Sequence, residues 1–104
     1  MTPRLPIPER AIPDFCRKWQ ITEFALFGSV LRDDFGPESD VDVLVSFAPG
    51  ARHSLFDLVH MEDELRAIFG RDVDLVTRRA VERGTNAWRR QAILDSLAHV
   101  GLAS

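Results

Sequence analysis

The spacing of apolar residues divides the first half of the chain into helices and strands. An amphipathic stripe at i, i+3, i+4 and i+7 predicts a first helix that contains Ile12, Phe15, Cys16 and Trp19. Residues 22–28 then have the composition of a strand that ends at a glycine, and residues 40–47 predict a second strand, apolar after Val43. Between the two strands, Ser29 to Phe35 has room for no more than two helical turns, with the serine placed as the cap.

The second half begins with a longer predicted helix. Ser54, with Asp57 three residues on, has the spacing of a capping box that opens a helix, and Gly70 is placed to end it. The apolar face of this helix is expected to comprise Leu55, Leu58, Val59, Leu65, Ile68 and Phe69.

A third strand and a closing helix complete the pattern. Residues 72–77 have strand composition, a short helical turn is expected before Gly84, and the closing helix runs from Asn86 to about His99. The order of elements is therefore α-β-α-β-α-β-α. It predicts an α/β fold of the α+β kind, in which helices pack on a small mixed β-sheet.

The composition is that of an ordinary globular protein, with 45% apolar and 28% charged residues among 104 positions. We expect one domain over residues 1–104, with an irregular, proline-containing lead-in at residues 1–8. No apolar run approaches the roughly 20 residues of a membrane span, and the N-terminus lacks the apolar stretch of a signal peptide, so a cytoplasmic protein with no membrane partner is expected. The net charge of −3 argues against a general nucleic-acid coat, and no direct nucleic-acid binding is expected. Cys16 is the single cysteine, which excludes an internal disulfide and fits a thiol in the core.

Two closely spaced aspartates open the second predicted strand. Because residues i and i+2 of a strand point to the same face about 6.5–7 Å apart, Asp40 and Asp42 either are simply solvated or hold a hard divalent cation. Asp74 begins the third predicted strand in the same style and can join them if the two strands are neighbours. Asp72 has the same parity, but Asp74 is flanked on both sides by apolar residues that would hold it in the sheet. Three such carboxylates can hold two magnesium ions about 3.5–4 Å apart, the arrangement used in phosphoryl-type displacement.

A glycine–serine pair ends the first predicted strand, and ten residues separate it from the aspartates. Gly28 would let the backbone approach an anion, and the helix that begins at Ser29 would offer unpaired N–H groups and a hydroxyl to phosphate. Arg32 either aims its guanidinium at the same phosphates or pairs with a neighbouring acid. Neither motif is specific alone, but their combination at this spacing indicates a site for metal ions and a nucleoside triphosphate.

The segment FGSVLRDDFGPESDVDVLV closely resembles the signature of the minimal nucleotidyltransferases of the DNA polymerase beta superfamily, which is Gly-Ser, ten residues and Asp-x-Asp. The match is strongest over residues 25–47 and continues more weakly through 54–69 and 71–77. It is similar in particular to the stand-alone prokaryotic antitoxins that are paired with a HEPN-domain toxin. Asp33 is a departure, since many relatives have a glycine there.

The resemblance implies a nucleotidyltransferase fold and a magnesium-dependent reaction. Gly28 and Ser29 would hold the triphosphate, Asp40 and Asp42 would ligate magnesium, and Asp74 would complete the triad and help to deprotonate the attacking hydroxyl. The implied reaction of these antitoxins is transfer of AMP from ATP to a tyrosine of the HEPN toxin. A domain of this size leaves no second domain to enclose a small acceptor, which also favours an acceptor on another protein.

Two other functions stay open at this point. The chain could neutralise a toxin by contact, with little or no catalysis, although such a protein has no need of the carboxylates and the Gly-Ser pair. Nucleotidyl transfer to RNA or to a small molecule is the other, and the net acidic charge does not favour RNA.

Several residues outside these motifs carry weaker signals. Five arginines lie between Arg78 and Arg90 against the single acid Glu82, and they form either a solvated face or a contact to triphosphate or partner. Trp88 lies in this segment and either packs inward or faces a partner. The histidines, which show no metal-ligand spacing, are expected on the surface or on a helix face: His53, His60 and His99. The aromatic residues expected in the core are Phe15, Trp19, Phe27, Phe47, Phe56 and Phe69.

Overall fold

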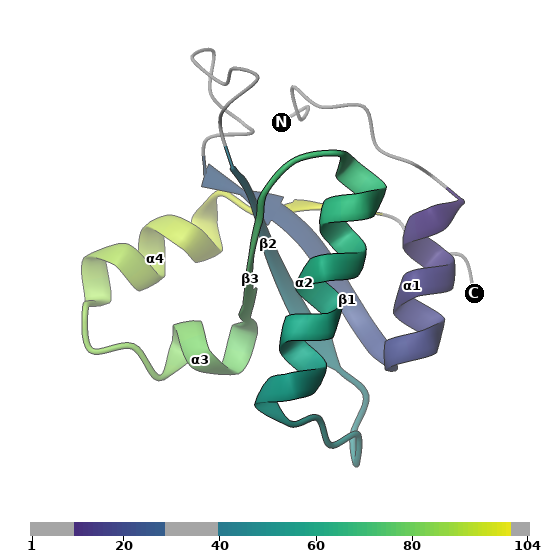
Figure 1. Cartoon of the computed structure of the whole chain (residues 1–104). Coiled ribbons are helices and arrows are strands. Elements are labelled where there is room, and N and C mark those ends of the chain that lie inside the picture. Colours follow the sequence, from purple (N-terminus) through teal and green to yellow (C-terminus); the bar gives the residue numbers. More distant parts are fainter. Residues whose placement is uncertain (1–9, 29–39, 101–104) are drawn as a thin grey trace.

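A computed structural model describes residues 10–28 and 40–100, which form a four-stranded mixed sheet with helices packed on it (Figure 1). The strands are β1 (Ile21–Phe27), β2 (Val41–Phe47), β3 (Val73–Thr77) and β4 (Ala98–His99). The helices are α1 (Ala11–Trp19), α2 (Leu55–Phe69), α3 (Arg78–Glu82) and α4 (Ala87–Asp95). The predicted α+β class is confirmed. The lead-in at residues 1–8 and the short helix expected over residues 29–35 lie outside the described residues.

The sheet has the strand order β3-β2-β1-β4. β1 pairs antiparallel with both β2 and β4, whereas β2 and β3 are parallel. Parallel neighbours need a crossover connection, and α2 provides it. The β2–α2–β3 unit therefore starts both parallel strands at the same end of the sheet, where β1 ends.

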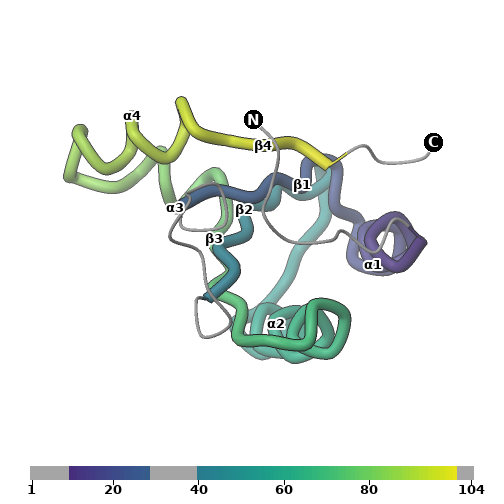
Figure 2. Tube along the Cα trace, turned by 90° about the horizontal axis from the view of Figure 1, so that it is seen from above, coloured from purple at the N-terminus to yellow at the C-terminus, as the bar shows by residue number. Residues whose placement is uncertain are grey.

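The hydrophobic core lies between the sheet and the buried faces of α1 and α2. Figure 2 shows α1 and α2 on one side of the sheet, with α4 away from them. One buried cluster includes alternate residues of β2 together with residues of both helices, among them Val41, Val43, Val45, Ile12, Met61 and Leu65. Cys16 is 3% exposed within this cluster, which confirms the predicted core thiol.

Both ends of α2 form as the sequence predicts. The Ser54 hydroxyl accepts a hydrogen bond from the Asp57 N–H at 3.2 Å, and the Asp57 carboxylate accepts one from the Ser54 N–H at 3.0 Å. Gly70 ends the helix in the left-handed region and donates its N–H to the Arg66 carbonyl at 2.7 Å. The expected capping box and glycine C-cap are confirmed.

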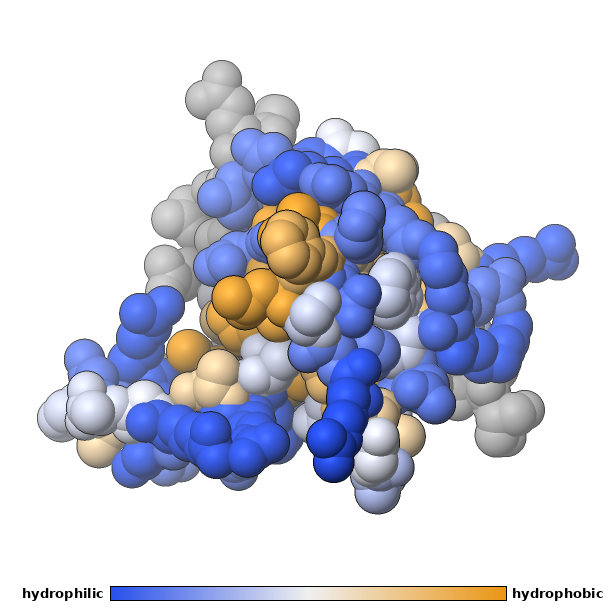
Figure 3. All heavy atoms as spheres, turned by 60° about the horizontal axis from the view of Figure 1, so that its bottom comes forward, coloured by the Kyte–Doolittle hydropathy of each residue, from blue (hydrophilic) through white to orange (hydrophobic). Residues whose placement is uncertain are grey.

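The apolar face of α2 differs from the prediction at its first turn. Leu55, Phe56 and Val59 have exposed fractions of 79%, 80% and 54%, so these residues do not belong to the core. Figure 3 shows hydrophobic residues gathered on the surface of the face that it draws. The stripe that meets the core begins one turn later, with Leu58, and continues through Met61 and Leu65. Spacing alone identifies an apolar stripe but does not show how far the sheet extends beneath the helix.

The end of the closing helix is also corrected. α4 ends at Asp95 instead of continuing to about His99, and the Ser96 hydroxyl donates to the Ile93 carbonyl just after it. Ala98 and His99 form β4, which pairs with β1. Hydrogen bonds along the outer edge of β1 stabilise this short strand, and that edge is not visible in the local apolar spacing.

His53 is a further correction, because it is not a surface residue. Its side chain is 11% exposed and packs against Trp19 and Phe47, with ring centroids 5.9 Å and 4.5 Å away. A ring nitrogen lies 2.8 Å from the Trp19 carbonyl oxygen. His53 therefore joins the loop before α2 to the end of α1.

Candidate active site

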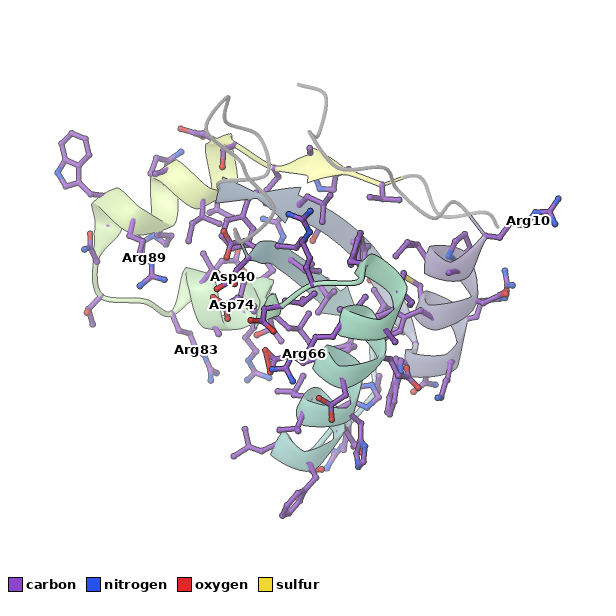
Figure 4. The ribbon with its side chains drawn as sticks, turned by 45° about the horizontal axis from the view of Figure 1, so that its top comes forward. Arg10, Asp40, Arg66, Asp74, Arg83 and Arg89 are labelled. Atoms are coloured by element: carbon purple, nitrogen blue, oxygen red, sulfur yellow. The ribbon has the colours of Figure 1, made fainter. Side chains whose placement is uncertain are left out.

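The parallel pairing of β2 and β3 brings two of the predicted carboxylates together. Asp42 and Asp74 are direct register partners on these strands. Since side chains alternate along a strand and Val41 and Val43 are buried in the core, Asp42 points to the opposite face of the sheet. Asp40 is exposed and lies immediately before β2, on the same side of the molecule as Asp74 (Figure 4).

Gly28 lies directly against the carboxylate of Asp42. The preceding residue, Phe27, ends β1 and is the register partner of Asp42. Gly28 has φ +73°, and a Cβ at this position would lie 2.4 Å from Asp42 Oδ2. Both the backbone conformation and the close approach require glycine. Ser29 and Arg32 lie outside the described residues.

Asp72, the alternative to Asp74, has different surroundings. Its side chain is 80% exposed and lies 3.9 Å from Arg66 of α2, and its carbonyl accepts a hydrogen bond from the Val41 N–H. Only Asp74 of the two lines the cavity described next. The structure therefore supports the choice of Asp74 as the third carboxylate.

The carboxylates lie at the floor of a cavity of about 630 Å³. Gly28, Asp42 and Asp74 contribute to its floor, and its walls come from α3, from residues 84–86 and from α4. A volume of this size is typical of a site for a small molecule or nucleotide. The cavity lies on the sheet face opposite α1 and α2.

The donor set of this cavity suits a hard divalent cation, because carboxylate oxygens are the ligands that magnesium prefers. Within residues 10–28 and 40–100, no three His, Cys, Asp or Glu side chains are gathered in an arrangement that could hold a metal ion. The fold itself thus aligns one pair, Asp42 and Asp74.

A polar network on the same face of the sheet holds α3 and β4 in place. Glu23 of β1 accepts two hydrogen bonds from Arg78, at 2.7 and 2.5 Å, and one from the Ser46 hydroxyl at 2.7 Å. A ring nitrogen of His99 lies 2.7 Å from the same carboxylate. The hydrogen bonds from Arg78, aided by those from Ser46 and His99, lower the pKa of Glu23 to about 2.

Sequence reasoning missed this network, because its members come from separate elements and share no local spacing. The sequence left Arg78 either on a solvated face or in contact with triphosphate or partner, but its guanidinium is paired with Glu23, and that hydrogen bond raises the pKa of Arg78. The network matters to the cavity because Arg78 opens α3, and α3 is one of the cavity walls.

Hydrogen bonds also stabilise α4 and the turn before it, which form another wall of the cavity. The Asn86 side chain caps α4 by accepting a hydrogen bond from the Arg89 N–H at 3.0 Å. The Arg90 guanidinium donates to the carbonyls of Glu82 and Gly84 across the turn between α3 and α4. Trp88, for which the sequence left two orientations open, faces outward with 89% of its surface exposed.

Comparison with known proteins identifies the family of this chain. Residues 9–97 match the family model described as the nucleotidyltransferase domain. The chain belongs to the nucleotidyltransferase domain family. The predicted resemblance to nucleotidyltransferases, inferred from the Gly-Ser and Asp-x-Asp motifs, is thereby confirmed.

Two curated relatives of this nucleotidyltransferase come from archaea. One is MJ1379 of Methanocaldococcus jannaschii, to which protein adenylyltransferase activity has been attributed; it is 30% identical over 83 residues, which is 80% of each chain. The other is the protein adenylyltransferase MntA of Thermococcus cleftensis, 34% identical over 67 residues, which is 64% of this chain and 66% of that protein.

A solved structure described as a minimal nucleotidyltransferase matches with a TM-score of 0.65 and 26% identity, over 90% of this chain and 88% of that chain, which confirms the nucleotidyltransferase fold. A crystal structure of a toxin–antitoxin with AMP-PNP matches with a TM-score of 0.70 and 19% identity, over 94% of this chain and 76% of that chain. Of the helices that the structure describes in our chain, none is long and apolar enough to cross a membrane.

Proposed function

We propose that this nucleotidyltransferase is a protein adenylyltransferase that transfers AMP from ATP to a toxin, and that it acts as the antitoxin of that pair. The observation that carries the proposal is the register of Asp42 with Asp74 at the floor of the cavity, with Gly28 against Asp42. The names of the relatives and the toxin–antitoxin neighbour support a protein acceptor.

Asp40, Asp42 and Asp74 are the residues that would hold magnesium, and Gly28 with Ser29 and Arg32 would hold the triphosphate. Magnesium, when bound, would neutralise charge that builds up on the phosphates. The carboxylate oxygens fit such an ion, and the absence of a side chain on Gly28 lets the Asp42 carboxylate lie directly against the backbone. Two ions are expected for a full set of three carboxylates.

The chain's own residues account for the positions of the reacting groups. The acceptor hydroxyl oxygen forms a bond to the α-phosphorus of ATP, the bond from that phosphorus to the bridging oxygen breaks, and pyrophosphate leaves. Asp74, which is exposed near the start of β3, would take the hydroxyl proton as a general base. Asp42 is fixed from both sides, by Gly28 and by the pairing with β3.

The acceptor is expected on a partner protein. We propose a tyrosine of a HEPN-type toxin, as the sequence resemblance implies. None of the 104 residues is a tyrosine, which fits an acceptor tyrosine outside this domain. The open side of the cavity, away from the core, leaves access for such a side chain.

The test is label transfer from ATP to the product of the neighbouring gene, in the presence of magnesium. Wild-type protein is expected to label that product, and the double variant Asp40→Asn/Asp42→Asn is expected to lose the transfer. Each of the other nucleoside triphosphates serves as a comparison for base preference. Tight binding between the two proteins without any transfer would contradict the proposal and would leave inhibition by contact.

A further inference from the structure

The arginine-rich segment at residues 78–90 has no role in the proposed reaction so far, and the structure separates its members. Arg78 is paired with Glu23, and Arg90 braces the turn before α4. The remaining three are exposed: Arg79, Arg83 and Arg89. Of these three, only Arg89 lines the cavity.

Arg89 is a cation without a side-chain partner inside the part of the chain that the structure describes. Its backbone N–H is used by the Asn86 cap, but no hydrogen bond or ion pair of its guanidinium is formed with residues 10–28 or 40–100. In Figure 4 the Arg89 side chain extends from α4 into the space between α3 and α4, on the side where Asp40 and Asp74 lie. The guanidinium is therefore available to a ligand in the cavity.

The charges in the cavity favour a phosphate group as the ligand of Arg89. Asp42 and Asp74 make the floor negative, and a nucleoside triphosphate adds several more negative charges. Magnesium held by the carboxylates would balance part of this charge, and a further cation on the wall of the cavity would balance the remainder. Arginine suits this task, because its planar fork binds phosphate oxygens through two parallel hydrogen bonds.

The element that carries Arg89 is held firmly enough to position it. Asn86 caps α4 one residue before it begins, and the Arg90 guanidinium ties the helix to the turn that precedes it. Arg89 lies in the first turn of this nine-residue helix, where the backbone dipole adds positive potential of the same sign.

We propose that Arg89 binds the polyphosphate of the nucleotide in this cavity, opposite the carboxylate floor. The inference rests on the proposed function, since it places the substrate of that reaction. In the arginine-rich segment, Arg78 and Arg90 are then structural and Arg89 binds the ligand. Arg79 and Arg83 are exposed and do not line the cavity.

The experiment is calorimetric titration of the purified chain with ATP, AMP and adenosine in the presence of magnesium. Arg89→Ala is expected to weaken ATP binding by roughly tenfold to a hundredfold, the loss typical of a charge-assisted hydrogen-bonded pair. The loss should shrink for AMP and vanish for adenosine, which has no phosphate. Arg89→Lys keeps the charge without the fork and is expected to bind ATP with intermediate affinity.

Arg83→Ala is the matched control. Arg83 is exposed in the same segment but does not line the cavity, so its replacement should leave ATP affinity unchanged. Equal ATP affinity of the wild type and Arg89→Ala would overturn the inference while leaving the proposed function intact. An equal loss for adenosine would also overturn it, because a contact to base or ribose would then be indicated. Absence of ATP binding by the wild type would instead refute both proposals.

Discussion

At the scale of single residues, the contact between Gly28 and Asp42 determines the geometry of the site. The glycine has φ +73° and leaves no room for a Cβ beside Asp42 Oδ2. The sequence motif singled out both residues, because a phosphate turn and a metal-binding carboxylate would each require a particular residue type at a particular spacing. That Gly28 lies against Asp42, and not only near phosphate, could not be predicted, because it depends on the pairing of β1 with β2.

Gly28→Ala is expected to affect activity much more than stability. The positive φ costs about 1–2 kcal/mol of the free energy of unfolding for a residue with a Cβ. The new methyl group must also displace the Asp42 carboxylate, and a displacement of about 1 Å at a reacting group can reduce the rate about 100-fold. Thermal unfolding and label transfer, measured on the same preparation, separate the two effects.

Gly70→Ala is the control for backbone strain. Gly70 has the same φ of +73° but has open space around a Cβ, at the end of α2. It should therefore lose similar stability and keep full activity. Equal loss of activity in both variants would show that strain, and not the displacement of Asp42, is responsible.

At the scale of elements, the helices and strands with local signals were predicted, and those that depend on distant pairing were not. The Ser54–Asp57 capping box and Gly70 are local, and both ends of α2 were predicted from them. β4 forms only by pairing with the edge of β1 that β2 does not occupy. Leu55 is exposed, although it fits the apolar spacing of α2. The Glu23 network likewise joins residues from separate elements.

The Glu23 network gives a prediction about acid stability. The pKa of Glu23 is lowered from 4.5 to about 2, chiefly by the hydrogen bonds from Arg78. A carboxyl group whose pKa is lowered in the folded state contributes stability that is fully present above the unfolded value of 4.5 and is lost as the pH falls toward about 2. Allowing for the solvent exposure of the pair, this contribution is on the order of 2 kcal/mol.

Urea unfolding of wild type and Glu23→Gln across this pH range tests the prediction. The variant should be less stable than the wild type at neutral pH, and the difference should narrow as the pH falls through the window. Because the network anchors α3, the variant should also bind ATP less tightly at neutral pH. Parallel stability curves for the two proteins would contradict the assignment of the low pKa to Glu23.

At the scale of the whole molecule, the sheet separates the main hydrophobic core from the cavity. One face is buried under α1 and α2, and the other carries the cavity, with a carboxylate floor and an arginine on the facing wall. The sequence predicted the floor through its motifs. It could not predict the wall, because α3 and α4 are oriented by contacts of Arg78 and Arg90 that have no sequence signature.

The central claim is that Asp42 and Asp74 form one site because β2 and β3 lie side by side in register, and label transfer by Asp74→Asn and Asp72→Asn tests it most directly. Asp72 lies immediately before β3 and Asp74 is its second residue, and both are exposed, but of the two only Asp74 lines the cavity. We predict that Asp74→Asn loses transfer to the partner protein by at least about 100-fold, as expected when a group that acts on the reacting atoms is removed, whereas Asp72→Asn keeps wild-type transfer. Full activity of Asp74→Asn, or equal losses in the two variants, would contradict the account.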